Sequence, residues 1–290
     1  MQHLASRRFL QQTTAVHSLN RAINVQRDMK KLFIALLSLY TLMLAYLYLV
    51  QRSFIYFPDF TRPVALAPNY ELENQGLLLK GWALNKEKNG AILYFGGNGE
   101  SVEYNISQFS NLFPNQAVYM LSYRGYGESE GMPTEDGIYA DALALYDKIR
   151  MQHKTISIIG RSLGSGVATY VAAHRETQKV VLITPFASIE ELAKDKFPIF
   201  PIGMLLIDKY LSIEHAKKID SEVLILYAGK DQVVPEDSTK RLVSSLAPDL
   251  TQTVKILDAG HNSISEYERY NRRLRDFFTS KSNLSLSKDN

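Results

Sequence analysis

The residues best suited to chemistry begin with a serine between two glycines. Gly160, Ser162 and Gly164 form the pattern G-x-S-x-G, which directly follows the apolar run ISII and opens a helical pattern that continues to about His174. A serine on a sharp turn from a strand to a helix holds its hydroxyl above the sheet, where a substrate can reach it. Ser162 is therefore the expected nucleophile, and its attack on a carbonyl carbon would form an acyl-enzyme.

A serine hydroxyl needs a base to take its proton, and the base needs a carboxylate to orient it. His261 is the expected base, because it follows the apolar run VKIL late in the chain, within DAGHNS. Asp231 is the expected acid, because it follows the run VLILY, within AGKDQVVP. The chain order serine, acid, histidine is the order that accompanies a strand-turn-helix serine.

Other residues compete for both roles. Asp258 and Asp237 are the rival acids: Asp258 is close to His261 in sequence, and Asp237 lies at a predicted helix start. The remaining histidines lie before the predicted membrane segment, before the acid in the chain, or inside a long connection: His3, His17, His153, His174 and His215.

The negative charge that develops on the substrate oxygen needs two backbone N–H donors. Leu163, the residue after the nucleophile, is expected to supply one of them. Asn98, in the loop GGNG after the run AILYF, is expected to supply the other, with Gly97 as the alternative. The competing interpretation of this loop is a plain tight turn. A phosphate-binding role is not expected, because no G-x-x-x-x-G-K-[ST] pattern is present.

The elements that must position these residues alternate along the chain from about Tyr70. Short apolar runs predict strands, and periodic segments between them predict helices. This alternation predicts an α/β fold with a mostly parallel central sheet, helices on both faces and chemistry in the loops after strands. The predicted strands are 75–84 (antiparallel), 91–95, 118–123, 156–159, 179–184, 223–227 and 254–257, and the predicted helices are 101–112, 134–151, 163–174, 236–246 and 263–279.

The longest connection, residues 186–221, includes Pro198 and Pro201, which exclude a single helix. Two interpretations stay open: a small cap over the site with an apolar inner side, or a packed crossover without a role in substrate choice.

An uncharged run from Leu32 to Val50 is about long enough to cross a bilayer as a helix. Four basic residues precede it closely and two follow it, which predicts a cytoplasmic N-terminus and a catalytic body on the outer, periplasmic or extracytoplasmic side. Those residues are Arg21, Arg27, Lys30, Lys31, Arg52 and Arg62. The alternative is a cleaved signal peptide starting near Met29, although residues 46–53 offer no small-x-small cleavage site.

The expected organisation is therefore an N-terminal cytoplasmic tail (1–31), a transmembrane anchor (32–50), a catalytic domain (54–280) and an unstructured tail (281–290). Residues 1–28 are polar and lack strong periodicity, so we expect no regular structure there. The net charge of +3 and the absence of a dense basic face make nucleic acid a poor partner. The absence of cysteine excludes disulfides, a thiol nucleophile and a zinc–thiolate site.

Together the motifs resemble the Bem46/ABHD17-like branch of the α/β-hydrolases, which includes bacterial membrane-anchored serine hydrolases of the YfhR type. The motifs are LYFGGNGES, SYRGYGESEG, GRSLGSG, TPFASIEEL, AGKDQVVP and AGHNS. Gly96 stands where that family has a histidine, and Ser263 stands where it often has an aspartate. The resemblance covers about residues 54–278 and implies hydrolysis of carboxylic esters or thioesters without a metal or another cofactor.

The leading hypothesis is thus a serine hydrolase acting on a small-molecule, lipid or acylated ester at a membrane. A serine peptidase of the prolyl-oligopeptidase type uses the same triad, but the chain shows no sign of its large accessory domain. A catalytically silent, membrane-anchored binding protein is the third hypothesis.

Overall fold

The computed structural model describes residues 2–280 and contains two compact units, Met1–Gln51 and Arg52–Asn290. The tail predicted for residues 281–290 lies outside the described residues.

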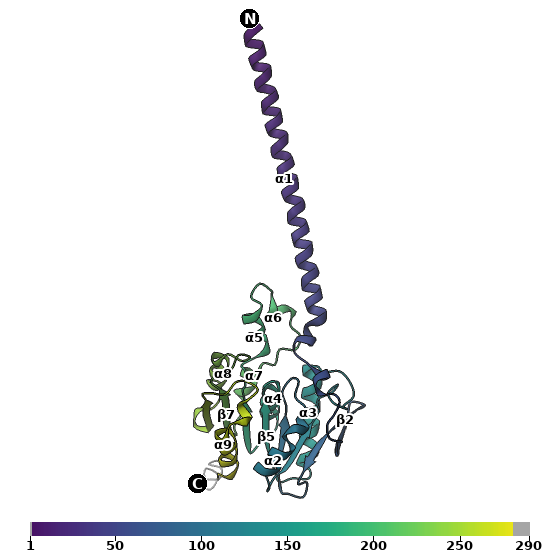
Figure 1. The fold of residues 1–290 in the computed structure, drawn as a ribbon, viewed down its shortest axis with the longest axis vertical. Coiled ribbons are helices and arrows are strands. Elements are labelled where there is room, and N and C mark those ends of the chain that lie inside the picture. Colours follow the sequence, from purple (N-terminus) through teal and green to yellow (C-terminus); the bar gives the residue numbers. More distant parts are fainter. Residues whose placement is uncertain (1, 281–290) are drawn as a thin grey trace. The chain divides into compact units, whose positions relative to one another are not determined.

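The second unit is built around one sheet of eight strands in the order β1-β2-β4-β3-β5-β6-β7-β8 (Figure 1). β1 and β2 are antiparallel to each other, β2 is antiparallel to β4, and all other neighbours are parallel. This confirms the predicted α/β fold with a mostly parallel sheet. The strands are β1 Tyr70–Asn74, β2 Leu77–Leu84, β3 Gly90–Phe95, β4 Ala117–Leu121, β5 Thr155–Arg161, β6 Lys179–Ile183, β7 Glu222–Ala228 and β8 Thr251–Ile256.

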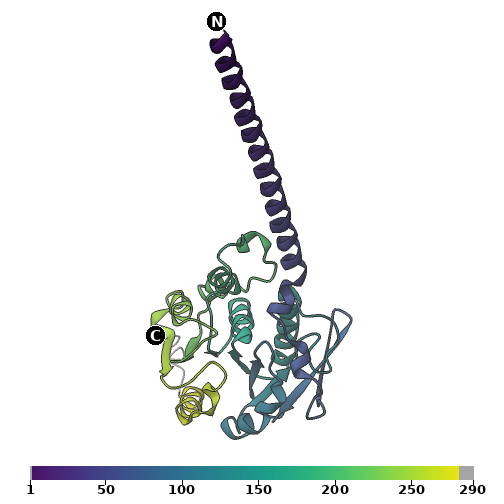
Figure 2. The ribbon, with the colours of Figure 1, turned by 45° about the horizontal axis from the view of Figure 1, so that its top comes forward.

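Helices cover both faces of the sheet, and each face has its own apolar core (Figures 1 and 2). Leu145, Val167 and Leu242 bring α3, α4 and α8 into one core. Phe109 and Leu274 bring α2 and α9 into the other. The helices of the sheet faces are α2 Ile106–Leu112, α3 Glu135–Arg150, α4 Leu163–His174, α8 Glu236–Val243 and α9 Glu268–Thr279.

A local hydrogen bond explains where α3 begins. The Thr134 side chain accepts a hydrogen bond from the Gly137 N–H at 3.0 Å and so caps α3 at the predicted residue. The segment predicted as one helix from residue 101 begins as a 3₁₀ turn. The short 3₁₀ helices are η1 Gln51–Phe54, η2 Pro58–Thr61, η3 Val102–Asn105, η4 Pro248–Leu250 and η5 Ile264–Glu266.

The connection between β6 and β7 contains three short helices: α5 Ile189–Lys196, α6 Ile202–Leu205 and α7 Ser212–Ala216. It leaves β6 at its carboxyl end. Because β5 and β6 are parallel neighbours, this is the edge of the sheet from which the chain leaves β5 into Ser162. The connection therefore starts beside the G-x-S-x-G turn.

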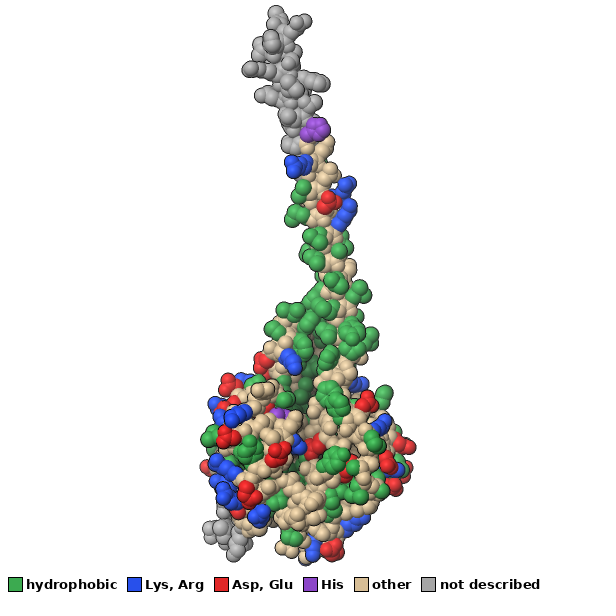
Figure 3. Space-filling model, in the orientation of Figure 1, with side chains coloured by type: hydrophobic (Ala, Val, Ile, Leu, Met, Phe, Trp, Pro, Cys, Tyr) green, Lys and Arg blue, Asp and Glu red, His purple; other side chains and the backbone are tan. Residues whose placement is uncertain are grey.

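The first unit is a single helix, α1, over Gln2–Val50. The expectation that residues 1–28 lack regular structure was wrong for the described part of that range. A helix that forms over the apolar run can extend towards the N-terminus, because residues 2–50 include neither glycine nor proline. In the part of the chain that the structure describes, one helix is long and apolar enough to cross a membrane (Figure 3).

Candidate active site

Ser162 lies on a strained turn between β5 and α4. Its φ of 50° and ψ of −118° are rare for a residue with a side chain. The surrounding hydrogen bonds fix this conformation: Ser162 N donates to Ile183 O at 2.9 Å, and Ser165 N donates to Ser162 O at 2.8 Å. This strained conformation presents the hydroxyl above the sheet.

The two glycines of the motif are required by close backbone approach. A Cβ on Gly164 would lie 2.0 Å from Phe95 O, and a Cβ on Gly160 would lie 2.2 Å from Gly164 O. No flexible side chain could move to relieve either clash. The glycines therefore allow α4 to start directly against the end of β3.

His261 joins the serine to a carboxylate. Its Nε2 lies 2.9 Å from Ser162 Oγ, and its Nδ1 lies 2.8 Å from Asp231 Oδ2. An ionised carboxylate can only accept hydrogen bonds, so the proton belongs on Nδ1, and Nε2 is left to accept from the serine hydroxyl. The three side chains predicted from the sequence thus form one hydrogen-bonded chain, with the imidazole 8% exposed.

The carboxylate of Asp231 is held on both sides. Oδ1 accepts hydrogen bonds from Val233 N at 2.9 Å and Val234 N at 2.8 Å, while Oδ2 faces His261. Burial raises the pKa of this carboxyl, but the hydrogen bonds from His261 and the two N–H groups outweigh burial, so its pKa lies below the ordinary value. Asp231 therefore remains ionised beside the imidazole.

The rival residues lie elsewhere. Asp258 is 78% exposed and pairs with Lys230 at 3.0 Å, and the Asp237 side chain is 77% exposed at the start of α8. Of the other histidines, His153 contacts Tyr119 Oη and Lys88 O. The side chain of His3 is outside the described residues.

Both expected oxyanion donors lie near the serine. One is its neighbour in the chain, and the other follows a strand that pairs with the strand before the serine. Leu163 is the first residue of α4, and Asn98 follows β3, whose Phe95 pairs with Gly160. A Cβ on Gly97 would lie 3.8 Å from Ser162 Cβ, which places this loop against the nucleophile. The N–H of Gly97 already donates to Glu100 Oε2 at 2.7 Å, which favours Asn98 over Gly97 as a donor to substrate.

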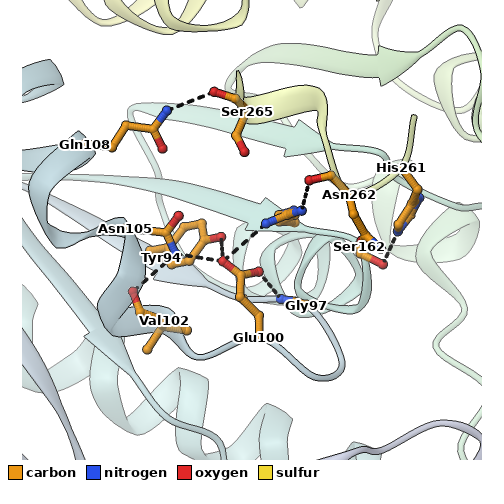
Figure 4. Close-up of polar contacts among 12 residues, drawn as sticks. Tyr94, Gly97, Glu100, Val102, Asn105, Gln108, Ser162, His261, Asn262 and Ser265 are labelled. Atoms are coloured by element: carbon orange, nitrogen blue, oxygen red, sulfur yellow. Dashed lines mark hydrogen bonds and ion pairs between the residues drawn. The ribbon is translucent and has the colours of Figure 1, made fainter. Parts of the chain in front are cut away.

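Glu100 organises the loop after β3 (Figure 4). Its carboxylate accepts from Tyr94 Oη at 2.6 Å, from Asn105 Nδ2 at 2.7 Å and from Gly97 N. A Cβ on Gly96 would lie 2.7 Å from Val102 Cγ1 and 3.5 Å from the Glu100 carboxylate. A side chain at position 96 would therefore require the Val102 side chain to shift, and in this chain Glu100 supports the loop.

Arg161 connects this network to the histidine loop. Its NH1 lies 3.6 Å from Glu100 Oε1, and its NH2 donates to Asn262 O at 3.0 Å. The side chains of Arg161 and Glu100 are 15% and 13% exposed. Arg161 precedes Ser162 and Asn262 follows His261, so one guanidinium links both. Sequence reasoning missed Glu100 and Arg161, although both lie inside motifs quoted above.

The loop after β4 supports the same region. Tyr123 Oη donates to Gly96 O at 2.8 Å, and Tyr126 Oη donates to Asn98 O at 2.9 Å. Arg124 in this loop binds the buried Asp141 through two hydrogen bonds of 2.7 and 2.8 Å. The two tyrosines of this loop thus support the loop that bears Asn98.

Comparisons with known proteins agree with this architecture. A family model described as alpha/beta hydrolase fold matches residues 90–205. An uncharacterized protein of Mycobacterium tuberculosis, MT2364, is 32% identical over 228 residues, covering 73% of this chain and 80% of that protein. Lysophosphatidylserine lipase ABHD12 of Macaca fascicularis is 37% identical over 152 residues, covering 45% of this chain and 38% of the lipase.

Solved structures show the same fold. Est1E from Butyrivibrio proteoclasticus, solved with ferulic acid bound, superposes with a TM-score of 0.61 at 18% identity, over 72% of this chain and 97% of that one. The Pyrococcus furiosus esterase Pf2001 superposes with a TM-score of 0.59 at 18% identity, over 72% and 90% of the two chains. The chain belongs to the α/β-hydrolase superfamily.

Proposed function

We propose that this protein is a serine hydrolase that cleaves carboxylic esters or thioesters through an acyl-enzyme. The observation that carries the proposal is the hydrogen-bonded chain from Ser162 Oγ through His261 to Asp231. Ser162 and His261 are 99 positions apart in the sequence, and Asp231 and His261 are 30 positions apart. Their side chains meet at the edge of the sheet where this fold binds ligands.

In the proposed mechanism, His261 Nε2 takes the proton of Ser162 as Oγ attacks the substrate carbonyl carbon. Asp231 stabilises the imidazolium that forms. The carbonyl oxygen becomes an oxyanion, which the N–H groups of Leu163 and Asn98 stabilise. His261 then gives its proton to the leaving alcohol or thiol, and the acyl-enzyme remains.

Water completes the cycle. His261 removes a proton from a water molecule, the hydroxide attacks the acyl carbon, and the second oxyanion occupies the same donors. Ser162 Oγ leaves and regains its proton from His261. No group other than those of the chain, the substrate and water is needed for atoms and charges to balance.

The substrate class is proposed as a small-molecule, lipid or acylated ester. The names of the relatives support it: one is a lysophosphatidylserine lipase and the structural neighbours include esterases. The apolar helix α1 supports an enzyme that acts at a membrane. In this proposal α1 crosses the bilayer, with its N-terminus in the cytoplasm and the catalytic unit outside. Protease protection in sealed cells tests this topology, and a protected, cytoplasmic catalytic unit contradicts it.

The activity is tested with p-nitrophenyl esters of increasing chain length, next to aminoacyl amides, using detergent-solubilised protein and its Ser162→Ala variant. Ester turnover that disappears in the variant supports the proposal. Faster turnover of the amides points to a peptidase instead, and no turnover of any substrate by a folded protein points to a binding role.

A further inference from the structure

The segment after β6 exposes an unusual apolar surface. Residues 197–207, FPIFPIGMLLI, contain no polar or charged side chain, and we call them the apolar tip. No residue of 189–207 is buried. Ile199 is 70% exposed, Met204 is 83% exposed and Ile207 is 47% exposed. Contiguous exposed apolar surface of this kind marks an interaction site in a stable protein.

The base of the apolar tip is fixed to the point where the chain enters the catalytic unit. Asp208 accepts hydrogen bonds from Arg52 Nε at 2.9 Å and from Tyr56 Oη at 3.1 Å. The rings of Phe54 and Phe197 lie 6.4 Å apart at an angle of 56°. These contacts join the two ends of the tip to residues 52–56.

That entry point is close to the end of the proposed anchor. The uncharged run of 19 residues ending at Val50 spans about 28 Å as a helix, which matches the hydrocarbon core of a bilayer. Arg52 follows Val50 by two residues, which reach at most about 7 Å even when extended. The connection between the proposed anchor and the base of the tip is therefore too short to act as a flexible linker.

Charged side chains flank the apolar tip at both ends. Lys194 and Lys209 pair with Glu190, whereas Lys196 is exposed. An exposed basic side chain beside an apolar segment attracts anionic headgroups.

We propose that the apolar tip inserts into the surface of the lipid bilayer and orients the catalytic unit against it. The connection starts at the edge of the sheet that carries Ser162, so an inserted tip brings that edge towards the lipid. The substrate class that follows is an ester or thioester whose apolar chain resides in the bilayer. This substrate statement rests on the proposed hydrolase chemistry, whereas the insertion rests only on the proposed membrane anchor.

The absence of cysteine gives a direct test. Met204→Cys provides a single site for an environment-sensitive fluorophore in the full chain, reconstituted in phosphatidylcholine–phosphatidylglycerol vesicles. Met151→Cys is the matched control, since Met151 is 81% exposed at the far end of α3. Glu135, at the near end, accepts from Tyr210 N at 2.9 Å, and the 16 residues of α3 span about 24 Å.

Insertion predicts blue-shifted emission at position 204 and quenching by lipids that carry spin labels on their acyl chains, with neither effect at position 151. Equal behaviour of the two positions overturns the proposal. The proposal is also overturned if the emission at position 204 is blue-shifted but not quenched by the spin-labelled lipids, and the shift disappears on dilution. That result would mean that the apolar tip contacts a second copy of the chain.

The substrate statement is tested separately with Met204→Asp and the control Met151→Asp. We expect Met204→Asp to lose activity on an ester embedded in vesicles and to keep activity on a soluble short-chain ester. Equal loss on both esters, or on neither, overturns delivery from the bilayer. The fluorescence reading needs no catalysis, so it stands in the Ser162→Ala background even if the proposed hydrolase chemistry fails.

Discussion

Glu100→Gln tests how residues 96–99 are held. We call these residues the oxyanion loop, because they include the proposed donor Asn98. The carboxylate accepts from Tyr94 and Asn105 on Oε1 and from Gly97 N on Oε2. A glutamine keeps one accepting oxygen and places an NH₂ group at the other position, which cannot accept. If the oxygen stays with the two side-chain donors, the N–H of Gly97 loses its acceptor.

The size of the effect follows from that single bond. A hydrogen bond to a charged group contributes about 1.5–3 kcal/mol. At about 1.36 kcal/mol for each factor of ten, its loss permits a rate effect of roughly 10- to 150-fold. The bond orients the peptide next to the N–H of Asn98, which acts on the transition state in the proposed mechanism. We therefore expect kcat for p-nitrophenyl acetate to fall about 10- to 100-fold while KM changes little.

Glu103→Gln is the matched control. Glu103 is also buried, at 7% exposed, and its carboxylate accepts from Ala65 N at 3.2 Å instead of from the oxyanion loop. Thermal unfolding followed by circular dichroism separates activity from stability. A folded Glu100→Gln protein with kcat within about threefold of wild type, or an equal loss in Glu103→Gln, refutes this reasoning.

Three further substitutions and one acid-unfolding profile test other features of the catalytic unit. Asp231→Asn should lower kcat roughly 10³- to 10⁴-fold with a folded protein, since the amide no longer fixes the imidazole tautomer; a loss below tenfold contradicts its role. Because the pKa of Asp231 is lowered on folding, its stabilisation is present above about pH 4 and is lost as the pH falls through the lowered value. Acid unfolding of Asp231→Asn should accordingly be less steep than that of the wild type. Arg124→Ala leaves the buried Asp141 unpaired and should cost about 3–5 kcal/mol in urea unfolding. Arg175→Ala breaks the more exposed pair with Asp147 and should cost at most about 1 kcal/mol, so equal losses contradict the assignment.

Sequence reasoning located the site because its residues follow strands. Ser162, Asp231 and His261 each come shortly after a continuous apolar run, and the carboxyl ends of parallel strands share one edge of the sheet. The grouping of these three side chains in the structure agrees with that reasoning, while their catalytic roles remain proposals.

The strand and the contacts that the sequence did not predict have physical explanations. β1 has the sequence YELEN, in which only Leu72 is buried, so no apolar run marks this edge strand. The support from Glu100 and Arg161 depends on residues that are 61 positions apart and become neighbours only when β3 and β5 pair. Motif spacing has no information about such contacts.

The most direct test of the central claim is the mapping of a fluorophosphonate adduct by peptide mass spectrometry. The reagent reacts covalently with a serine that a neighbouring base has activated. The account predicts one adduct, on Ser162, and none in Ser162→Ala or His261→Ala. A folded wild-type protein that carries no adduct, or that is labelled equally in Ser162→Ala, contradicts the account.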